Sequence, residues 1–200
     1  MTELPLPRFR YHPDPVATGM FVPCRDFTCG VCHESRSYAY IGPYASRTFG
    51  FKNGDEICPW CIADGSAARE WNAHFVDAES LSPAALAQMS SDARVELAFR
   101  TPSFLCLQQP EWLDDHGEAA AYLGEVGFDE YLRLPLEAQR VVRYCVGDKP
   151  NEPLRANDFV QRLRADGNGP AAYLFQLPAL RMVRRVHGSG MIGSGPRWPN

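Results

Sequence analysis

The order of apolar and polar residues changes along the chain and predicts strands first and helices afterwards. Residues 35–57 carry aromatic and β-branched side chains and a turn signal at Asn53-Gly54, which together predict short antiparallel strands. From Cys58 onward the composition becomes helical, and Pro59 stands where a first helical turn tolerates proline. A helix is therefore expected to begin at Cys58.

The first segment, residues 1–23, shows no such periodicity. It is rich in proline and glycine, which disfavour a helix, so we expect an extended arm that runs over the surface. Phe9, Tyr11 and Phe21 are the apolar side chains available to pin this arm. His12 lies in a His-Pro-Asp-Pro string that is typical of a fixed turn, which favours a structural role for this histidine.

Beyond residue 80 the pattern is mostly helical. Helices are expected from Ser82-Pro83, over 92–99, over 129–145 with an interruption near Pro135, and from a cap at Asn157-Asp158 to Ala165. Residues 171–176 predict a single strand. The stretch 187–200 is rich in glycine, serine and proline, and its composition predicts disorder.

Composition and charge narrow the class of protein. The chain has 200 residues, 45% of them apolar, and its 20 basic and 24 acidic side chains give a net charge of −4. No stretch approaches the roughly 18–20 apolar residues of a membrane span, and the first residues lack the order of a secretory signal. We therefore expect a cytoplasmic protein without a membrane span.

The cysteines carry the clearest chemical signal. Two C-x-x-C pairs, Cys29 with Cys32 and Cys58 with Cys61, are separated by 25 residues. Each pair can supply two thiolates from one tight turn, and a hairpin could bring the two turns together into a closed shell of four sulfurs, which suits structural Zn²⁺. The sequence thus predicts zinc bound by these four cysteines.

Other roles for the cysteines stay open. The Cys-Pro-Trp-Cys string at a helix start also looks like a thioredoxin-type dithiol, but the polar residues 53–56 precede it where a buried apolar strand is usual. Cys24 could replace one of the four ligands. Cys106 and Cys145 are expected to pack as small apolar residues.

No group of residues predicts catalysis. His33 and His74 are more readily explained as structural than as catalytic, and a run of acidic residues near a helix start is commonly a set of caps. That run consists of Asp114, Asp115, His116 and Glu118. We find no Ser-His-Asp order, phosphate-binding glycine loop or paired-carboxylate signature, so the sequence gives no support to an enzyme.

These observations predict an α+β fold. A small treble-clef-like zinc module with a β-hairpin is expected to be followed by a mostly helical body. Its parts are an extended N-terminal arm at 1–23, the zinc-binding module at 24–80, the helical body with its C-terminal strand at 81–176, and a disordered tail at 177–200.

Several strings together resemble the CbrC family, bacterial proteins whose founding member is associated with colicin tolerance. The resemblance spans residues 9 to about 176 and implies a small zinc-type protein with a role in tolerance of, or immunity to, a bacterial toxin. The strings are Phe9-Arg-Tyr-His-Pro-Asp-Pro15 with Thr18-Gly19, Cys58-Pro-Trp-Cys-Ile-Ala-Asp-Gly-Ser-Ala67, Arg100-Thr-Pro102, Gln108-Gln-Pro-Glu-Trp-Leu113 and Tyr173-Leu-Phe175.

The resemblance ends in the tail. Members of that family follow the Tyr-Leu-Phe strand with a further C-x-x-C, whereas residues 177–181 here read Leu-Pro-Ala-Leu-Arg. One extra base before codons for Cys-Leu-His-Cys-Gly would give these five residues. The resemblance therefore implies that 177–200 is a frameshifted tail, and the alternative is a genuine basic tail.

The function expected from the sequence is that of a non-enzymatic, zinc-stabilised protein that binds another protein, in the family's case a bacterial toxin. The alternative is a protein that binds nucleic acid through its zinc module. A net charge of −4 argues against nucleic acid, because the concentrated basic residues all lie in the tail.

Overall fold

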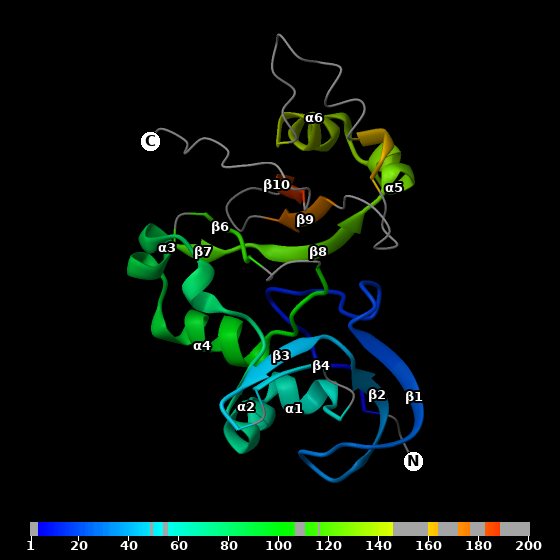
Figure 1. The fold of residues 1–200 in the computed structure, drawn as a ribbon, viewed down its shortest axis with the longest axis vertical. Helices are drawn as coiled ribbons and strands as arrows, with labels where there is room; N and C mark the ends of the chain where they lie inside the picture. The colour runs from blue at the N-terminus through cyan, green and yellow to red at the C-terminus, as the bar shows by residue number, and fades with distance from the viewer. Residues whose placement is uncertain are drawn as a thin grey trace.

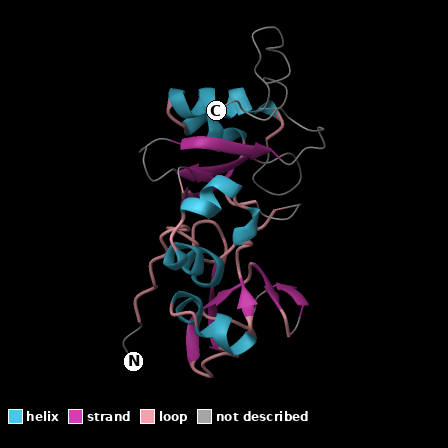
Figure 2. Ribbon diagram, turned by 90° about the vertical axis from the view of Figure 1, so that its left-hand side faces the viewer, coloured by secondary structure: helices cyan, strands magenta, loops and turns pink. Residues whose placement is uncertain are grey.

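The structure is a computed structural model that describes residues 4–48, 50–53, 56–106, 111–115, 117–145, 160–163, 172–176 and 183–188. The molecule is long: an N-terminal lobe of short strands and helices lies at one end, and a second sheet with helices over it lies at the other (Figure 1). Figure 2 shows this layering from the side. None of the helices among the described residues has both the length and the apolar character needed to cross a membrane.

The N-terminal lobe contains two small antiparallel sheets and two short helices. One sheet pairs β1 with β2, and the other has the order β4-β3-β5. The strands are β1 (Phe21–Thr28), β2 (Ser35–Tyr40), β3 (Pro43–Ser46), β4 (Gly50–Asn53) and β5 (Ala73–His74), and the helices are α1 (Pro59–Ala63) and α2 (Ser66–Trp71). The antiparallel strands expected between residues 35 and 57 and the helix expected after Cys58 are confirmed.

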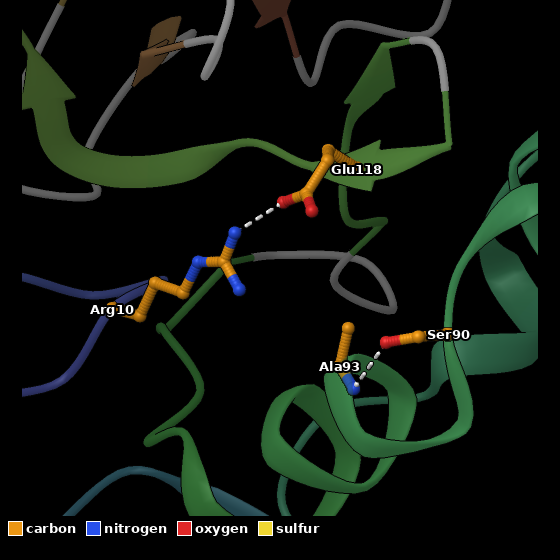
Figure 3. A network of polar contacts seen from close by, with 4 residues as sticks. All are labelled: Arg10, Ser90, Ala93 and Glu118. Carbon is orange, nitrogen blue, oxygen red and sulfur yellow. Dashed lines mark hydrogen bonds and ion pairs between the residues drawn. The ribbon is translucent and has the colours of Figure 1, made fainter.

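Helices with capping side chains, Asp77 for the first and serines for the other two, lie between the two ends of the molecule. They are the 3₁₀ helix η1 (Ala78–Ser80), α3 (Pro83–Gln88) and α4 (Ser91–Arg100). The Ser82 side chain accepts a hydrogen bond from the Ala85 amide, and Ser90 does the same for Ala93 at 3.2 Å (Figure 3). The Asp114 carboxylate in turn accepts from the backbone and hydroxyl of Ser82 at 2.9 and 2.8 Å. One member of the acidic run therefore does support a helix start, as expected.

The second sheet corrects the expectation of a mostly helical body. Strands β8 (Ala121–Val126), β9 (Ala172–Gln176) and β10 (Val183–Gly188) form an antiparallel sheet in the order β10-β9-β8, and the short β6 (Asp114–Asp115) and β7 (Glu118–Ala119) pair beside it. The helices α5 (Phe128–Arg133) and α6 (Leu136–Cys145) follow β8, and Val160 and Gln161 are also helical. The interruption near Pro135 and the strand at 171–176 are confirmed.

Strand β8 was missed because its sequence does not alternate cleanly. Tyr122 and Val126 are buried, but the register of β8 on β9 shifts between Tyr122 and Gly124. Gly124 has a φ of 138°, a conformation that other residues rarely adopt. The shift breaks the period of two, so the apolar pattern does not indicate a strand.

The expectation of a disordered tail at 177–200 fails for Val183–Gly188. These residues form β10, in which Val186 lies opposite Leu174 of β9. The backbone N–H and C=O groups at the edge of β9 can pair with any extended segment. The composition of that segment therefore does not reveal the pairing. The other residues of the tail, and most of the helix expected from 157 to 165, lie outside the described residues. The reading-frame hypothesis concerns the gene and stays a prediction.

Apolar side chains gather in three clusters. The N-terminal lobe has its own, around Phe21, Tyr40 and the cysteines, and a second lies between α3, α4 and the second sheet. A third packs α5 and α6 on that sheet around Tyr131 and Val142. The clusters give each end of the molecule a separate core.

The N-terminal arm joins the first two clusters. Phe9 packs in the cluster of the N-terminal lobe, and Tyr11, two residues later, packs in the second cluster. Between them, Arg10 forms an ion pair with Glu118 of β7 at 2.6 Å (Figure 3). Phe9, Tyr11 and Phe21 are all buried, as expected of side chains that pin the arm.

His12 fixes the arm to the end of α4. Its Nδ1 lies 2.9 Å from the Pro102 carbonyl oxygen, and its Nε2 lies 2.7 Å from the Thr18 hydroxyl. Because a carbonyl oxygen only accepts, Nδ1 carries the proton, and Nε2 accepts from Thr18. The ring is fully buried, and burial lowers the pKa of His12 to about 4. His12 is thus a neutral structural residue, as the sequence favoured.

We expect this histidine to make stability depend on pH. An unfolded chain protonates His12 below its ordinary pKa of 6.5, while the folded chain keeps it neutral down to about 4, so stability is complete above this window and falls as the pH drops through it. The free energy of unfolding should fall by about 1.4 kcal/mol between pH 8 and pH 5.5 because of His12. Urea unfolding of the wild type and of His12→Asn measures it. The variant should lack this part of the pH dependence. If the free energy of unfolding fell equally steeply with decreasing pH in both proteins, the prediction would be contradicted.

Candidate metal centre

The structure brings the two C-x-x-C pairs together. All four Sγ atoms lie within 4.8 Å of one another. The Cys29 and Cys61 sulfurs are 3.8 Å apart, and those of Cys32 and Cys58 are 3.9 Å apart. A tetrahedron with metal–sulfur bonds of about 2.3 Å has edges of roughly 3.8 Å. The four cysteines could therefore hold one metal ion.

The first pair lies in the turn between β1 and β2. The Cys29 amide donates to the Glu34 carbonyl at 3.0 Å, and the His33 amide donates to the Cys29 carbonyl at 2.8 Å. His33 adopts a φ of 59°, which lets the chain reverse directly after Cys32. A Cβ atom on Gly30 would lie 2.9 Å from the Trp71 ring, so this turn needs glycine at position 30.

The second pair lies at the start of α1. Cys58 is the extended residue before the helix, and Pro59 is its first residue. The Tyr40 amide donates to the Ile57 carbonyl at 2.9 Å, which fixes this start against the end of β2. The Cys58 amide also donates to the Cys29 sulfur at 3.3 Å, so a direct contact joins the two turns.

The electrostatics of the four sulfurs fit a cation. Hydrogen bonds from the thiols of Cys58 and Cys61 hold the pKa of Cys29 far below its usual range. The same bonds raise the pKa of Cys58 to about 12 and raise that of Cys61 further, because each thiol keeps its proton beside the Cys29 thiolate. The Cys29 sulfur therefore favours the thiolate, while Cys58 and Cys61 favour the thiol. A divalent cation between them would replace the S–H bonds and allow all four to ionise.

Three of the four cysteines are buried, and the fourth is partly covered by neighbouring side chains. Cys29, Cys58 and Cys61 are at most 2% exposed, and Cys32 is half-buried. The Arg36 guanidinium donates to the Cys32 sulfur at 3.5 Å and lies over the Trp60 ring at 5.2 Å. Sequence reasoning missed Arg36 and Trp60, because only the folded chain brings them beside Cys32.

The remaining candidates lie elsewhere. Cys24 is in β1, and its thiol points to the Arg25 carbonyl at 3.8 Å, so it does not belong to the cluster. His33 serves the turn through its backbone while its side chain is exposed, and His74 pairs in β5. Cys106 packs against the second cluster, as expected, and the side chain of Cys145 is outside the described part of the chain.

Comparison with known proteins identifies the family. The model of the uncharacterised protein family UPF0167 matches residues 6–184. The chain belongs to the UPF0167 family. UPF0167 protein Mb2317 of Mycobacterium bovis is 43% identical over 179 residues, which cover 88% of this chain and 89% of the relative. UPF0167 protein PA1536 of Pseudomonas aeruginosa is 40% identical over 144 residues, which cover 70% and 76%. No solved structure matches the chain.

This membership corrects the resemblance drawn from the sequence. The matching family model and the relatives carry the UPF0167 name, and the CbrC name is not among them. The strings that suggested CbrC lie wholly within the matched residues, so they are features of a UPF0167 chain. The expected link to colicin and toxin immunity rested on that resemblance, and these comparisons give it no support.

Proposed function

We propose that this UPF0167 protein is a zinc-stabilised protein without an enzymatic role, which works by binding another protein. The observation that carries the zinc site is the set of four sulfurs within 4.8 Å of one another, contributed by the β1–β2 turn and the start of α1. Zinc is the metal that best fits a closed S₄ shell with a structural role. The ion would hold the β1–β2 turn to the start of α1.

The order of elements supports a treble-clef-like module. A turn carrying Cys29 and Cys32 comes first, the β3–β4 hairpin follows, and α1 starts directly after Cys58. Because the two turns and the five-residue helix are short, a bound ion would supply much of the stability that this part of the lobe needs.

A binding role is favoured over catalysis because the four cysteines and His12 are already occupied by structural contacts. Four protein ligands would leave no open position on the metal for a substrate. Both ring nitrogens of His12 already have partners inside the protein. The net charge of −4 favours a protein partner over a nucleic acid.

Elemental analysis tests the zinc site. Protein purified without chelator should contain one zinc per chain, and a chelator should remove it together with the near-ultraviolet circular dichroism of the N-terminal lobe. Iron in place of zinc, or fully folded protein free of metal, would refute this part of the proposal.

Affinity purification from the native host tests the binding role. A protein should be retained in stoichiometric amount, and the same protein should bind again when both are purified. A polyanion-binding assay is the matched comparison. Saturable binding to nucleic acid without a protein partner would replace the proposal with the nucleic-acid alternative.

The Cys-Pro-Trp-Cys pair should show no oxidoreductase turnover. Both of its thiolates would be committed to the metal, and neither would be free to attack a disulfide repeatedly. Insulin reduction in the presence of dithiothreitol measures this. Metal-independent turnover that disappears in Cys61→Ala would contradict the prediction.

A further inference from the structure

The four sulfurs of the centre are not equally protected. Cys29 accepts hydrogen bonds from the amides of Val31 and Cys58 at 3.4 and 3.3 Å and is fully buried. Cys58 and Cys61 are buried as well, whereas Cys32 is half-buried. The side chain of Arg36, which comes from β2, donates a hydrogen bond to the Cys32 sulfur. A small reagent from solvent therefore meets the Cys32 sulfur first.

We propose that Cys32 is an oxidation site for hydrogen peroxide, and that oxidation ends in a Cys32–Cys58 disulfide that releases the metal. This inference rests on the proposed zinc site. Peroxide is the fitting oxidant because it is small and uncharged, and a half-buried sulfur admits it more readily than a bulky disulfide. Thiolate character and exposure together decide which cysteine oxidises.

The chemistry runs in two balanced steps. The Cys32 thiolate attacks one peroxide oxygen, so an S–O bond forms, the O–O bond breaks, and hydroxide leaves. The Cys58 thiolate then attacks the sulfur of this sulfenic acid, so an S–S bond forms, the S–O bond breaks, and a second hydroxide leaves. Each sulfur gives up one electron, and one peroxide accepts two. Two thiolates remain, so the centre loses half of its ligands.

The position of Cys58 selects the product. Its sulfur lies 3.9 Å from that of Cys32, and it belongs to the other turn. The disulfide would therefore join the β1–β2 turn to the start of α1, the same two elements that the metal joins. A disulfide within one C-x-x-C pair would leave these elements unconnected. Oxidation at Cys32 thus exchanges one crosslink for another.

Arg36 moderates the reaction. Its guanidinium covers the Cys32 sulfur and donates to it, which holds electron density that the attack on peroxide needs. Arg36→Gln keeps a polar side chain and removes the charge, and the variant should lose metal about threefold faster under peroxide. Cys24→Ser is the control, since Cys24 lies on β1 outside the cluster, and it should behave as the wild type.

The experiment begins with metal-loaded full-length protein whose zinc content has been measured. Peroxide is added in steps, released zinc is followed with a chromogenic chelator, and linked peptides are identified by mass spectrometry. One zinc should leave per peroxide consumed, at the rate at which the Cys32–Cys58 peptide pair appears. Dithiothreitol with added zinc should reverse both changes.

The two proposals fail in different ways. Absence of zinc before peroxide is added overturns the zinc site itself. Zinc present at the start, followed by a Cys29–Cys32 or Cys58–Cys61 disulfide or by release without any disulfide, overturns the oxidation site alone. An unchanged rate in Arg36→Gln also counts against Cys32 as the point of attack.

Discussion

Cys58→Ser should abolish metal binding and prevent the N-terminal lobe from folding. Structural zinc sites in small modules contribute apparent binding free energies of about 10–16 kcal/mol, which equals or exceeds the net stability of about 5–15 kcal/mol of a whole domain. Serine removes one ligand and leaves two buried thiols and the half-buried thiol of Cys32 with no partner of the right charge. The lobe should lose its cooperative unfolding transition.

Elemental analysis and amide hydrogen exchange check this prediction together. Exchange over residues 21–75 should rise to the rates of an unfolded chain in Cys58→Ser, while Cys24→Ser keeps both its metal and its protection. A Cys58→Ser protein that retains one metal per chain and slow exchange in this region would show that the four cysteines do not form the centre.

Trp112→Ala should produce the second large effect, at the other end of the molecule. Trp112 is buried among Phe104, Tyr122 and Phe175, with ring centroids 5.5, 6.4 and 5.7 Å away, and its indole nitrogen donates to the Ala120 carbonyl at 2.8 Å. Removing this ring leaves a large cavity and an unpaired carbonyl, a change that lowers the free energy of unfolding by about 3–5 kcal/mol.

Chemical denaturation measures the loss, and Trp112→Phe is its control. Phenylalanine keeps an aromatic ring in the cluster and gives up only the hydrogen bond and part of the volume, so it should lose less than half as much. Both variants should still contain one metal per chain, because Trp112 and the cysteines belong to different clusters. Loss of metal in Trp112→Ala would mean that the two cores fold as one.

The sequence predicts those features that depend on neighbours in the chain. Ser82-Pro83 and Cys58-Pro59 begin helices because a cap and a proline act within one turn. The four cysteines were predicted for the same reason: each C-x-x-C turn is local, and only the meeting of the two turns needs the rest of the lobe.

Structural features that depend on residues far away in the sequence were not predicted. Strand β8 owes its place to β9, about fifty residues later, and its irregular register hides the apolar alternation. Strand β10 pairs through backbone atoms that every sequence possesses. Arg36 lies over Trp60 because β2 and α1 meet, and the sequence around either residue does not indicate that contact.

The double attachment of the arm has a consequence for synthesis on the ribosome. The apolar cluster of the N-terminal lobe ends at Phe75, so the four cysteines can come together early in translation. Tyr11 and His12 can dock only later in synthesis. The carbonyl that His12 bonds is 90 residues further along the chain, and β8, whose Tyr122 amide donates to the Tyr11 carbonyl, comes later still. We therefore expect stalled chains ending before residue 100 to bind metal while residues 10–12 remain open to protease. Chains that extend past β9 should protect them, and early protection would show that the arm docks without its partners.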